Sequence, residues 1–262
     1  MKIISIIGCG WLGMPLAEKL MEEGHHVKGT TTTPEKLAVL QQKGIVPYLV
    51  TLNPQLELAD DTFFECDLLI INIPPSTYSK GPEYHPKQIA SLVSKIHQHQ
   101  IRNVFYISST SVYPENNRSV DENVELTIEN DRQKALLLSE QTLQSGNFCL
   151  NILRCGGLMG YDRLPHRFLS KSFKSRMKKN INTPVNYIHR DDVIAIIKEL
   201  IKKESTDEIY NLVAPEHPLR KEFIEGDMEE DNNIPSYKVV SSKKIVRFLG
   251  YQFKYPNPLN FK

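Results

Sequence analysis

The sequence predicts an α/β fold built on a doubly wound parallel sheet. Strand-like and helix-like segments alternate along most of the 262 residues, which is the pattern of a parallel sheet covered by helices on both faces. Residues 67–73 are nearly all apolar, as expected for a strand that is buried on both sides. A glycine-rich turn, Gly8-Cys9-Gly10-Trp11-Leu12-Gly13, comes directly after the first apolar run at residues 3–7. Together these observations favour a sheet of the Rossmann type.

The glycine-rich turn has the spacing of a dinucleotide-binding fingerprint. Gly8 permits a tight turn out of the strand, Gly10 lets the backbone approach a pyrophosphate, and Gly13 lets the next helix pack closely on the sheet. The unpaired N–H groups at the start of that helix favour an anion, so Trp11 and Leu12 are expected to border the same phosphate site. A helix ending at Gly24 and a strand over 26–31 follow, as the fingerprint requires. The turn predicts an NAD or NADP cofactor.

The other elements follow in the order expected of such a sheet. A loop at residues 110–125 leaves the carboxyl end of a predicted strand, the edge where ligands bind in open α/β sheets. Residues 1–157 are predicted to form the dinucleotide-binding core, and residues 158–262 a small C-terminal substrate-side lobe that returns elements to it within one structural unit. Predicted strands in the core cover 46–52, 67–73, 104–108 and 148–154, and predicted helices cover 86–98 and 131–144. In the lobe we expect helices at 165–178 and 191–203, strands at 184–188 and 208–213, a charged segment at 220–231, and a closing strand and helix over 237–249.

Composition limits the function classes. With 32 basic and 31 acidic residues the net charge is +1, which favours neither nucleic acid nor an anionic membrane surface as a partner. No signal peptide or membrane-spanning segment is recognisable, so the expected location is the cytoplasm. The four cysteines form no CxxC pair and no metal-ligand spacing, so we expect thiols and no metal site. The expected partner is a small molecule, and a homodimer is left open.

Three further motifs occur in a familiar order after the glycine turn. They are Val-Phe-Tyr-Ile-Ser-Ser-Thr-Ser-Val-Tyr at 104–113, Tyr-Ile-His-Arg-Asp-Asp-Val at 187–193 and Glu-Ile-Tyr-Asn-Leu at 208–212. With the turn, they resemble the extended short-chain dehydrogenase/reductase family of nucleotide-sugar epimerases and dehydratases. The resemblance implies an NAD(P)-dependent oxidoreductase or epimerase/dehydratase-like activity on a carbonyl or hydroxyl group, with Ser109 as the substrate-binding hydroxyl.

The sequence departs from that family at its catalytic pair. Typical members have a Tyr-x-x-x-Lys pair followed four residues later by a glutamate. If Glu140 is that glutamate, Leu136 stands at the lysine position and Arg132 at the tyrosine position. Shifting the register to Lys134 places Asn130 at the tyrosine position, and an amide cannot act as an acid near neutral pH. The pattern therefore resembles the atypical branch of the family.

Ser109, Tyr113 and Arg132 are the candidate catalytic residues. A positioned general acid contributes roughly 10² to 10⁴ in rate, so another group must replace the missing tyrosine if the protein is an enzyme. Tyr113 ends the hydroxyl-rich turn, and Arg132 could stabilise an oxyanion. The alternatives are that Tyr113 packs the loop against the core and that Arg132 forms a salt bridge to Glu129 or Asp121.

The end of the second strand indicates which cofactor is bound. The sequence Gly-Thr-Thr-Thr-Thr-Pro-Glu-Lys at 29–36 lacks the acid that usually holds the NAD ribose at the strand tip. Thr31, Thr32 and Lys36 instead offer donors to a 2′-phosphate, which favours NADP over NAD. Thr33 is also expected to be the N-cap of the next helix, with Pro34 at its first position.

A basic cluster between residues 163 and 179 points to an anionic substrate. Arg163 and Arg167 are the predicted substrate-binding residues, and the alternative is a solvated helix face. His189 is expected to be a structural hydrogen-bonding residue, and Asp191 or Asp192 a helix N-cap.

Two other functions stay open. The missing pair favours a non-catalytic NAD(P)-binding regulator. Residues 14–17 and 24–27 also resemble the β-hydroxyacid dehydrogenase family, whose members continue into a long all-helical domain that the predicted strands of this chain contradict.

Overall fold

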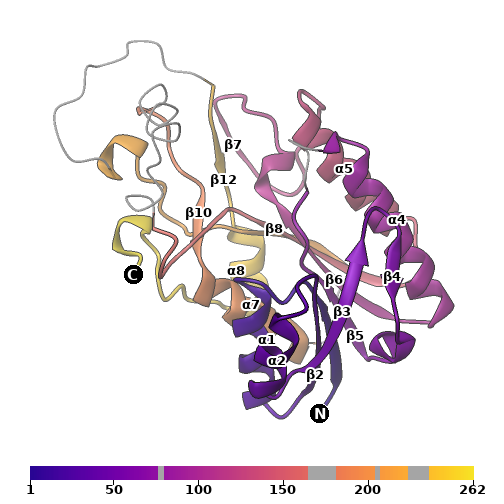
Figure 1. Ribbon diagram of the computed structural model, residues 1–262. Coiled ribbons are helices and arrows are strands. Elements are labelled where there is room, and N and C mark those ends of the chain that lie inside the picture. The colour runs from indigo at the N-terminus through magenta and orange to yellow at the C-terminus, as the bar shows by residue number, and fades with distance from the viewer. Residues whose placement is uncertain (76–79, 165–180, 204–206, 224–235) are drawn as a thin grey trace.

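The computed structural model describes residues 1–75, 80–164, 181–203, 207–223 and 236–262. Its centre is an eight-stranded sheet with the order β11-β8-β6-β5-β1-β2-β3-β4 (Figure 1). All neighbouring strands are parallel except the edge strand β4, which is antiparallel to β3. The strands are β1 (Ile3–Ile7), β2 (His26–Thr31), β3 (Val46–Leu52), β4 (Leu56–Leu58), β5 (Leu68–Ile71), β6 (Asn103–Ser109), β8 (Cys149–Cys155) and β11 (Ile209–Leu212). The predicted fold class is confirmed.

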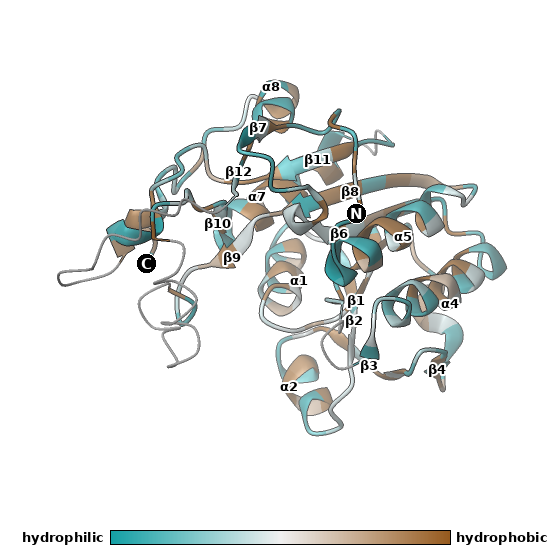
Figure 2. Cartoon of the chain, turned by 90° about the horizontal axis from the view of Figure 1, so that it is seen from above, coloured by the Kyte–Doolittle hydropathy of each residue, from teal (hydrophilic) through white to brown (hydrophobic). Residues whose placement is uncertain are grey.

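Helices cover both faces of this sheet. Figure 2 shows α1 and α7 on one side and α4 and α5 on the other. The helices are α1 (Gly13–Glu22), α2 (Lys36–Gln42), α4 (Tyr84–Gln98), α5 (Asp131–Gln144), α7 (Arg190–Lys203) and α8 (Lys243–Leu249). Short 3₁₀ turns lie at η1 (Asp61–Phe64), η2 (Thr110–Val112), η3 (Arg220–Phe223) and η4 (Pro258–Asn260).

Of the four buried apolar clusters among the described residues, the two largest pack on the two faces of the main sheet. Successive residues of a strand point to opposite faces, so Ile6 of β1 joins the cluster under α1 and α7 while Ile7 joins the cluster under α4. All four residues of β5 are buried, as its apolar sequence predicts. Each fully buried leucine or isoleucine contributes about 1.5 to 3 kcal/mol. This burial fixes the strand ends that carry the site.

Two small parallel sheets extend the fold beyond the carboxyl ends of the strands. In the first, β9 (Gly157–Met159) pairs with β10 (Tyr187–His189). In the second, β7 (Arg118–Val120) pairs with β12 (Lys238–Val240). From the final third of the chain, β11 completes the main sheet beside β8 and α7 packs beside α1.

Several predicted elements match the structure and others differ. The strands at 26–31 and 46–52 and the helix at 131–144 have the predicted bounds. The prediction that Thr33 caps a helix is wrong: its carbonyl accepts from the Lys36 amide 3.0 Å away in a separate turn, and α2 begins only at Lys36. The predicted helix at 165–178 lies outside the described residues, as does the charged segment beyond residue 223.

The predicted N-cap role of Asp191 or Asp192 is also wrong. Both residues lie within the first turn of α7, which begins at Arg190. The buried carboxylate of Asp192 accepts hydrogen bonds from the Tyr251 hydroxyl at 2.7 Å and from the amides of Lys254 and Tyr255 at 2.8 and 3.1 Å. Asp192 therefore anchors the C-terminal segment. No helix in the described part of the chain has the length and apolar character needed to cross a membrane.

Candidate cofactor and substrate site

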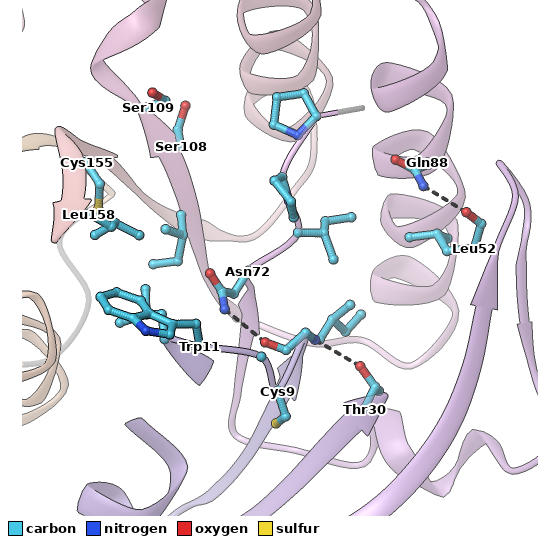
Figure 3. Close-up of a pocket in the computed structure, with 18 of the residues that line it drawn as sticks. Cys9, Trp11, Thr30, Leu52, Asn72, Gln88, Ser108, Ser109, Cys155 and Leu158 are labelled. Carbon is cyan, nitrogen blue, oxygen red and sulfur yellow. Dashed lines mark hydrogen bonds between the residues drawn. The ribbon is translucent and has the colours of Figure 1, made fainter. Parts of the chain in front are cut away.

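A cavity of about 790 Å³ lies at the carboxyl ends of the central strands β1, β2, β5 and β6 (Figure 3). The connections from β1 run to β2 on one side, and the later part of the chain builds on β5, so this is the switch point at which open α/β sheets bind ligands. The cavity extends from the glycine turn and the end of β2 to the hydroxyl-rich turn after β6. Of the predicted site residues it is lined by Gly8, Gly10, Trp11, Leu12, Thr31, Thr32, Lys36, Ser109, Arg132 and Arg163.

Each of the three glycines in the turn is needed for a different structural reason. Gly8 has φ +100°, and a Cβ there would lie 2.3 Å from the Asn72 carbonyl oxygen. A Cβ on Gly13 would lie 2.3 Å from the Gly8 carbonyl oxygen, so this glycine allows α1 to pack on the turn and does not itself line the cavity. A Cβ on Gly10 would have no atom within 4 Å. Gly10 therefore leaves open space for a ligand, the requirement for a close pyrophosphate.

Two residues that the sequence analysis missed hold this turn in place. The Asn72 side-chain amide donates to the Gly8 carbonyl at 2.9 Å, and the Gly8 amide donates to the Thr30 hydroxyl at 2.9 Å (Figure 3). Asn72 follows β5 directly. A polar residue immediately after an apolar strand was therefore the sequence pattern that could have predicted its role. The turn is thus fixed from both neighbouring strands before any ligand binds.

Trp11 of the turn is surrounded by charged residues from the C-terminal part of the chain. Its indole N–H donates to Asp162 at 2.7 Å, and the guanidinium carbons of Arg163 and Arg190 lie 4.4 and 4.6 Å from its ring centroid. Arg190 also donates to the Trp11 carbonyl at 3.2 Å. Arg163 therefore lies at the glycine-turn end of the cavity. Arg167 lies outside the described residues.

The end of β2 presents hydroxyl groups and one cation to the cavity. Thr31, Thr32, Thr33 and Lys36 line it, and none of the described lining residues is acidic. The Thr31 hydroxyl accepts from the Thr33 amide at 3.1 Å, which shapes the strand tip. This environment can accept a phosphate without like-charge repulsion.

At the other end of the cavity, Arg132 and Leu136 of α5 lie near Ser109. Their lining positions agree with the register that takes Glu140 as the family glutamate. In contrast, Lys134 forms an ion pair with Glu83 at 2.6 Å and does not line the cavity. The structure thus places both residues of that register, Arg132 and Leu136, in the cavity wall.

The predicted alternative for Arg132, a salt bridge to Glu129 or Asp121, is absent between these described residues. The Ser109 hydroxyl donates to the Ser111 hydroxyl at 3.1 Å and accepts from the Ser111 amide at 3.1 Å. Four hydroxyl residues, Ser108 to Ser111, and the Arg132 guanidinium therefore border this end of the cavity.

Tyr113 lies below the cavity and not in its wall. Its side chain is fully buried, its hydroxyl donates to the Asn211 side chain at 2.7 Å, and it accepts from Arg154 at 2.9 Å. Burial raises the pKa of Tyr113 to about 12. Tyr113 therefore packs the loop against the core, as the structural alternative predicted, and it is not among the residues that line the cavity.

A buried ion pair connects Tyr113 to the cavity wall. Arg154 of β8 lies 2.6 Å from Glu140 of α5, and both side chains are almost completely buried. Glu140 also accepts from the Ser108 hydroxyl at 2.6 Å, and Ser108 lines the cavity. This network fixes α5, and hence Arg132, relative to β6.

The remaining predicted polar residues have structural roles. His189 ends β10, where its Nδ1 accepts from the Asp191 amide at 3.2 Å and its Nε2 donates to the Lys262 carbonyl at 3.1 Å. The cysteines are free thiols, and burial raises the pKa of Cys9 and Cys155 to about 12. Among the described residues, no cluster of His, Cys, Asp and Glu could hold a metal ion.

Comparison with known proteins identifies the family. Protein YeeZ of Escherichia coli K12 is 31% identical over 273 residues, which cover 99% of this chain and 98% of YeeZ. The chain belongs to the YeeZ family. Residues 3–111 also match the family described as NADP oxidoreductase, coenzyme F420-dependent. That match covers the strands and helices of the glycine-turn half of the sheet.

Solved structures show the wider fold. UDP-N-acetylglucosamine 4-epimerase from Bacillus cereus is 14% identical with a TM-score of 0.76, over 97% of this chain and 95% of that one. A short-chain dehydrogenase/reductase superfamily protein from Agrobacterium tumefaciens with bound NAD is 17% identical with a TM-score of 0.74, over 97% and 93%. MoeE5 in complex with UDP-glucose and NAD is 14% identical with a TM-score of 0.76, over 98% and 95%. The YeeZ-family chain thus has the extended short-chain dehydrogenase/reductase fold, with an NAD(P)-binding type of N-terminal domain. Its strands β11 and β12 exclude the all-helical C-terminal domain of the β-hydroxyacid dehydrogenases.

Proposed function

We propose that this protein binds NADP(H) in the main cavity and acts on a carbonyl or hydroxyl group of a small, anionic, sugar-derived substrate. One observation carries the proposal: a single cavity joins the glycine turn, the hydroxyl-rich end of β2, and the Ser109 and Arg132 side chains. The complex of MoeE5 with UDP-glucose and NAD supports a sugar-derived substrate for this fold.

The cavity offers a separate place for each part of the cofactor. The open space at Gly10 and the start of α1 suits the pyrophosphate. Thr31, Thr32 and Lys36 suit the 2′-phosphate of NADP. Arg163, stacked on Trp11, adds positive charge beside the glycine turn. When bound, the nicotinamide ring would supply hydride transfer.

The reaction end of the cavity can hold a substrate oxygen and stabilise negative charge on it. The Ser109 hydroxyl can donate to that oxygen when its O–H turns away from Ser111. The Arg132 guanidinium can stabilise an oxyanion, although it cannot release a proton at ordinary pH. In this proposal Tyr113 is a positioning residue, because its hydroxyl holds Arg154 against Glu140 under the cavity. Proton transfer would then depend on Ser109 or on solvent.

Cofactor binding can be measured through Trp11, the single tryptophan of the sequence. Titration with NADPH and with NADH should quench its fluorescence, with NADPH binding about 10-fold tighter or more, since charge-assisted hydrogen bonds contribute roughly 1.5 to 3 kcal/mol. Lys36→Gln should reduce the preference, while Lys43→Gln, which removes a cation just beyond α2, should leave it unchanged. Equal dissociation constants for the two cofactors would overturn the NADP assignment.

Leu136 favours a second candidate, a non-catalytic NAD(P)-binding regulator, because it places an apolar side chain where the family has its lysine. NADP⁺ reduction with a panel of sugar phosphates and UDP-sugars separates the two. An enzyme should show turnover that Arg132→Gln lowers at least 10-fold and that Lys134→Gln, on the same helix but outside the cavity, does not change. Cofactor binding without turnover across the panel would favour the regulator.

A further inference from the structure

A second cavity, of about 210 Å³, adjoins the main one beyond the hydroxyl-rich turn. The two share Thr110, Ser111 and Gly157 as lining residues, so they meet beside Ser109. The far wall of the second cavity comes from three segments that are distant in sequence: residues 183–187, Arg220, and residues 236–238. None of these positions belongs to the predicted site, and the cavity forms only when the C-terminal lobe folds over the strand ends.

Arg220 lines this cavity with a side chain that is only partly exposed. Its backbone amide donates to the Thr183 carbonyl at 3.0 Å, which fixes the residue at the start of η3. The guanidinium Nε is buried, and within the described chain it has no hydrogen-bond partner. No acidic side chain of the described residues forms an ion pair with it. Because leaving a buried charged donor unpaired costs about 1 to 3 kcal/mol or more, its position suggests an acceptor that comes from a ligand.

Lys238 supplies a second cation to the same cavity. Its ammonium donates to the Tyr113 carbonyl at 2.7 Å, which leaves further N–H donors available. Among the described residues it forms one ion pair, with Glu115 at 3.9 Å, and that side chain is half exposed, so the pair contributes little. The pKa of Lys238 is lowered, mainly because it is buried and also because of Arg132, while Glu115 and Glu129 oppose the shift. Among the described residues, the lining of this cavity therefore contains two cations, Arg220 and Lys238, and one acid, Glu115.

We propose that the second cavity binds an oxyanion group of the substrate, a carboxylate or a phosphate, between Arg220 and Lys238. The inference rests on the proposed function, because the anion would belong to a molecule whose reacting carbon lies beside Ser109. A guanidinium fork and an ammonium group together match the oxygens of either group. The anionic end of the substrate would then lie here, away from the Arg163 and Trp11 pair at the glycine turn.

The test uses inorganic phosphate and acetate as separate probes. Each is titrated into the full-length protein saturated with NADPH, which occupies the pyrophosphate site, at constant ionic strength kept with chloride. Binding is followed by isothermal calorimetry for wild type, Arg220→Gln, Lys238→Gln and the matched control Lys221→Gln. Lys221 is exposed and adjacent to Arg220, so its removal changes the charge but not the cavity. Thermal melting of each variant shows whether it is folded.

We expect saturable binding of at least one probe, weakened 10-fold or more in Arg220→Gln and Lys238→Gln and unchanged in Lys221→Gln. Saturation by phosphate alone indicates a phosphorylated substrate, and saturation by acetate indicates a carboxylate. No saturable binding of either probe, or equal weakening in Lys221→Gln, overturns the inference. If NADPH itself fails to bind wild type, the proposed function fails, and the same titrations on the cofactor-free protein still decide whether the anion cavity exists.

Discussion

Alanine substitutions at Gly10 and Gly13, which lie in the same turn, should have different effects: the first should weaken cofactor binding and the second should lower stability. A Cβ on Gly13 would lie 2.3 Å from the Gly8 carbonyl oxygen, far inside van der Waals contact, whereas a Cβ on Gly10 would meet no protein atom within 4 Å. Gly13→Ala should therefore strain the packing of α1 on the turn. Gly10→Ala should leave the fold intact and place a methyl group in the space proposed for the pyrophosphate.

The magnitudes follow from the same contacts. Overpacking of this kind costs about 1 to 3 kcal/mol, which lowers the melting temperature of a protein of this size by roughly 3 to 10 °C. Gly10→Ala should melt within about 1 °C of wild type, because the added methyl group is in open space. Its NADPH dissociation constant should rise about 10-fold or more, equivalent to about 1.4 kcal/mol.

Differential scanning fluorimetry and NADPH titration on both variants provide the assay. Leu20→Ala is a suitable comparison, because it removes a buried side chain of α1 that does not line the cavity. Unchanged NADPH affinity in Gly10→Ala would contradict the placement of the pyrophosphate. A wild-type melting temperature in Gly13→Ala would refute the argument from close packing.

Three other outcomes follow from the buried network and the cavity edge. Glu140→Gln should lower the free energy of unfolding in urea by about 3 to 5 kcal/mol, because it leaves Arg154 buried beside a neutral amide. The double variant with Arg154→Met should recover part of that loss. A loss below about 1 kcal/mol in Glu140→Gln would contradict this reasoning. Burial raises the pKa of Tyr113 to about 12, above its value near 10 in the unfolded chain. The contribution of Tyr113 to the free energy of unfolding is therefore fully present below pH 10 and is lost as the pH rises toward 12. Over that window the unfolding free energy of wild type should fall by about 1.4 kcal/mol per pH unit more than that of Tyr113→Phe, and parallel curves would show that Tyr113 ionises normally. Arg163→Ala should weaken NADPH binding several-fold because its guanidinium stacks on Trp11; a loss confined to substrate affinity would return Arg163 to the predicted substrate role.

Most of the sheet was predictable because it depends on local pattern. Strand alternation, the buried run at β5 and the glycine spacing each depend on neighbouring residues, and they place the strands of the main sheet, except β4, within two residues of their observed bounds. The short strands β4 and β7 were missed, since three residues carry too little periodicity to be recognised.

The sequence by itself determined the ligand type and the missing catalytic pair. The glycine turn and the positions Arg132 and Leu136 are read from spacing, and the structure places both of those side chains in the cavity wall. Only the tertiary structure decided that Tyr113 is buried, because its hydroxyl meets Asn211, which is 98 positions away. The tertiary structure likewise brings Arg220 and Lys238 into one cavity. Such contacts depend on how the lobe packs over the sheet, and no local pattern in the chain encodes that packing.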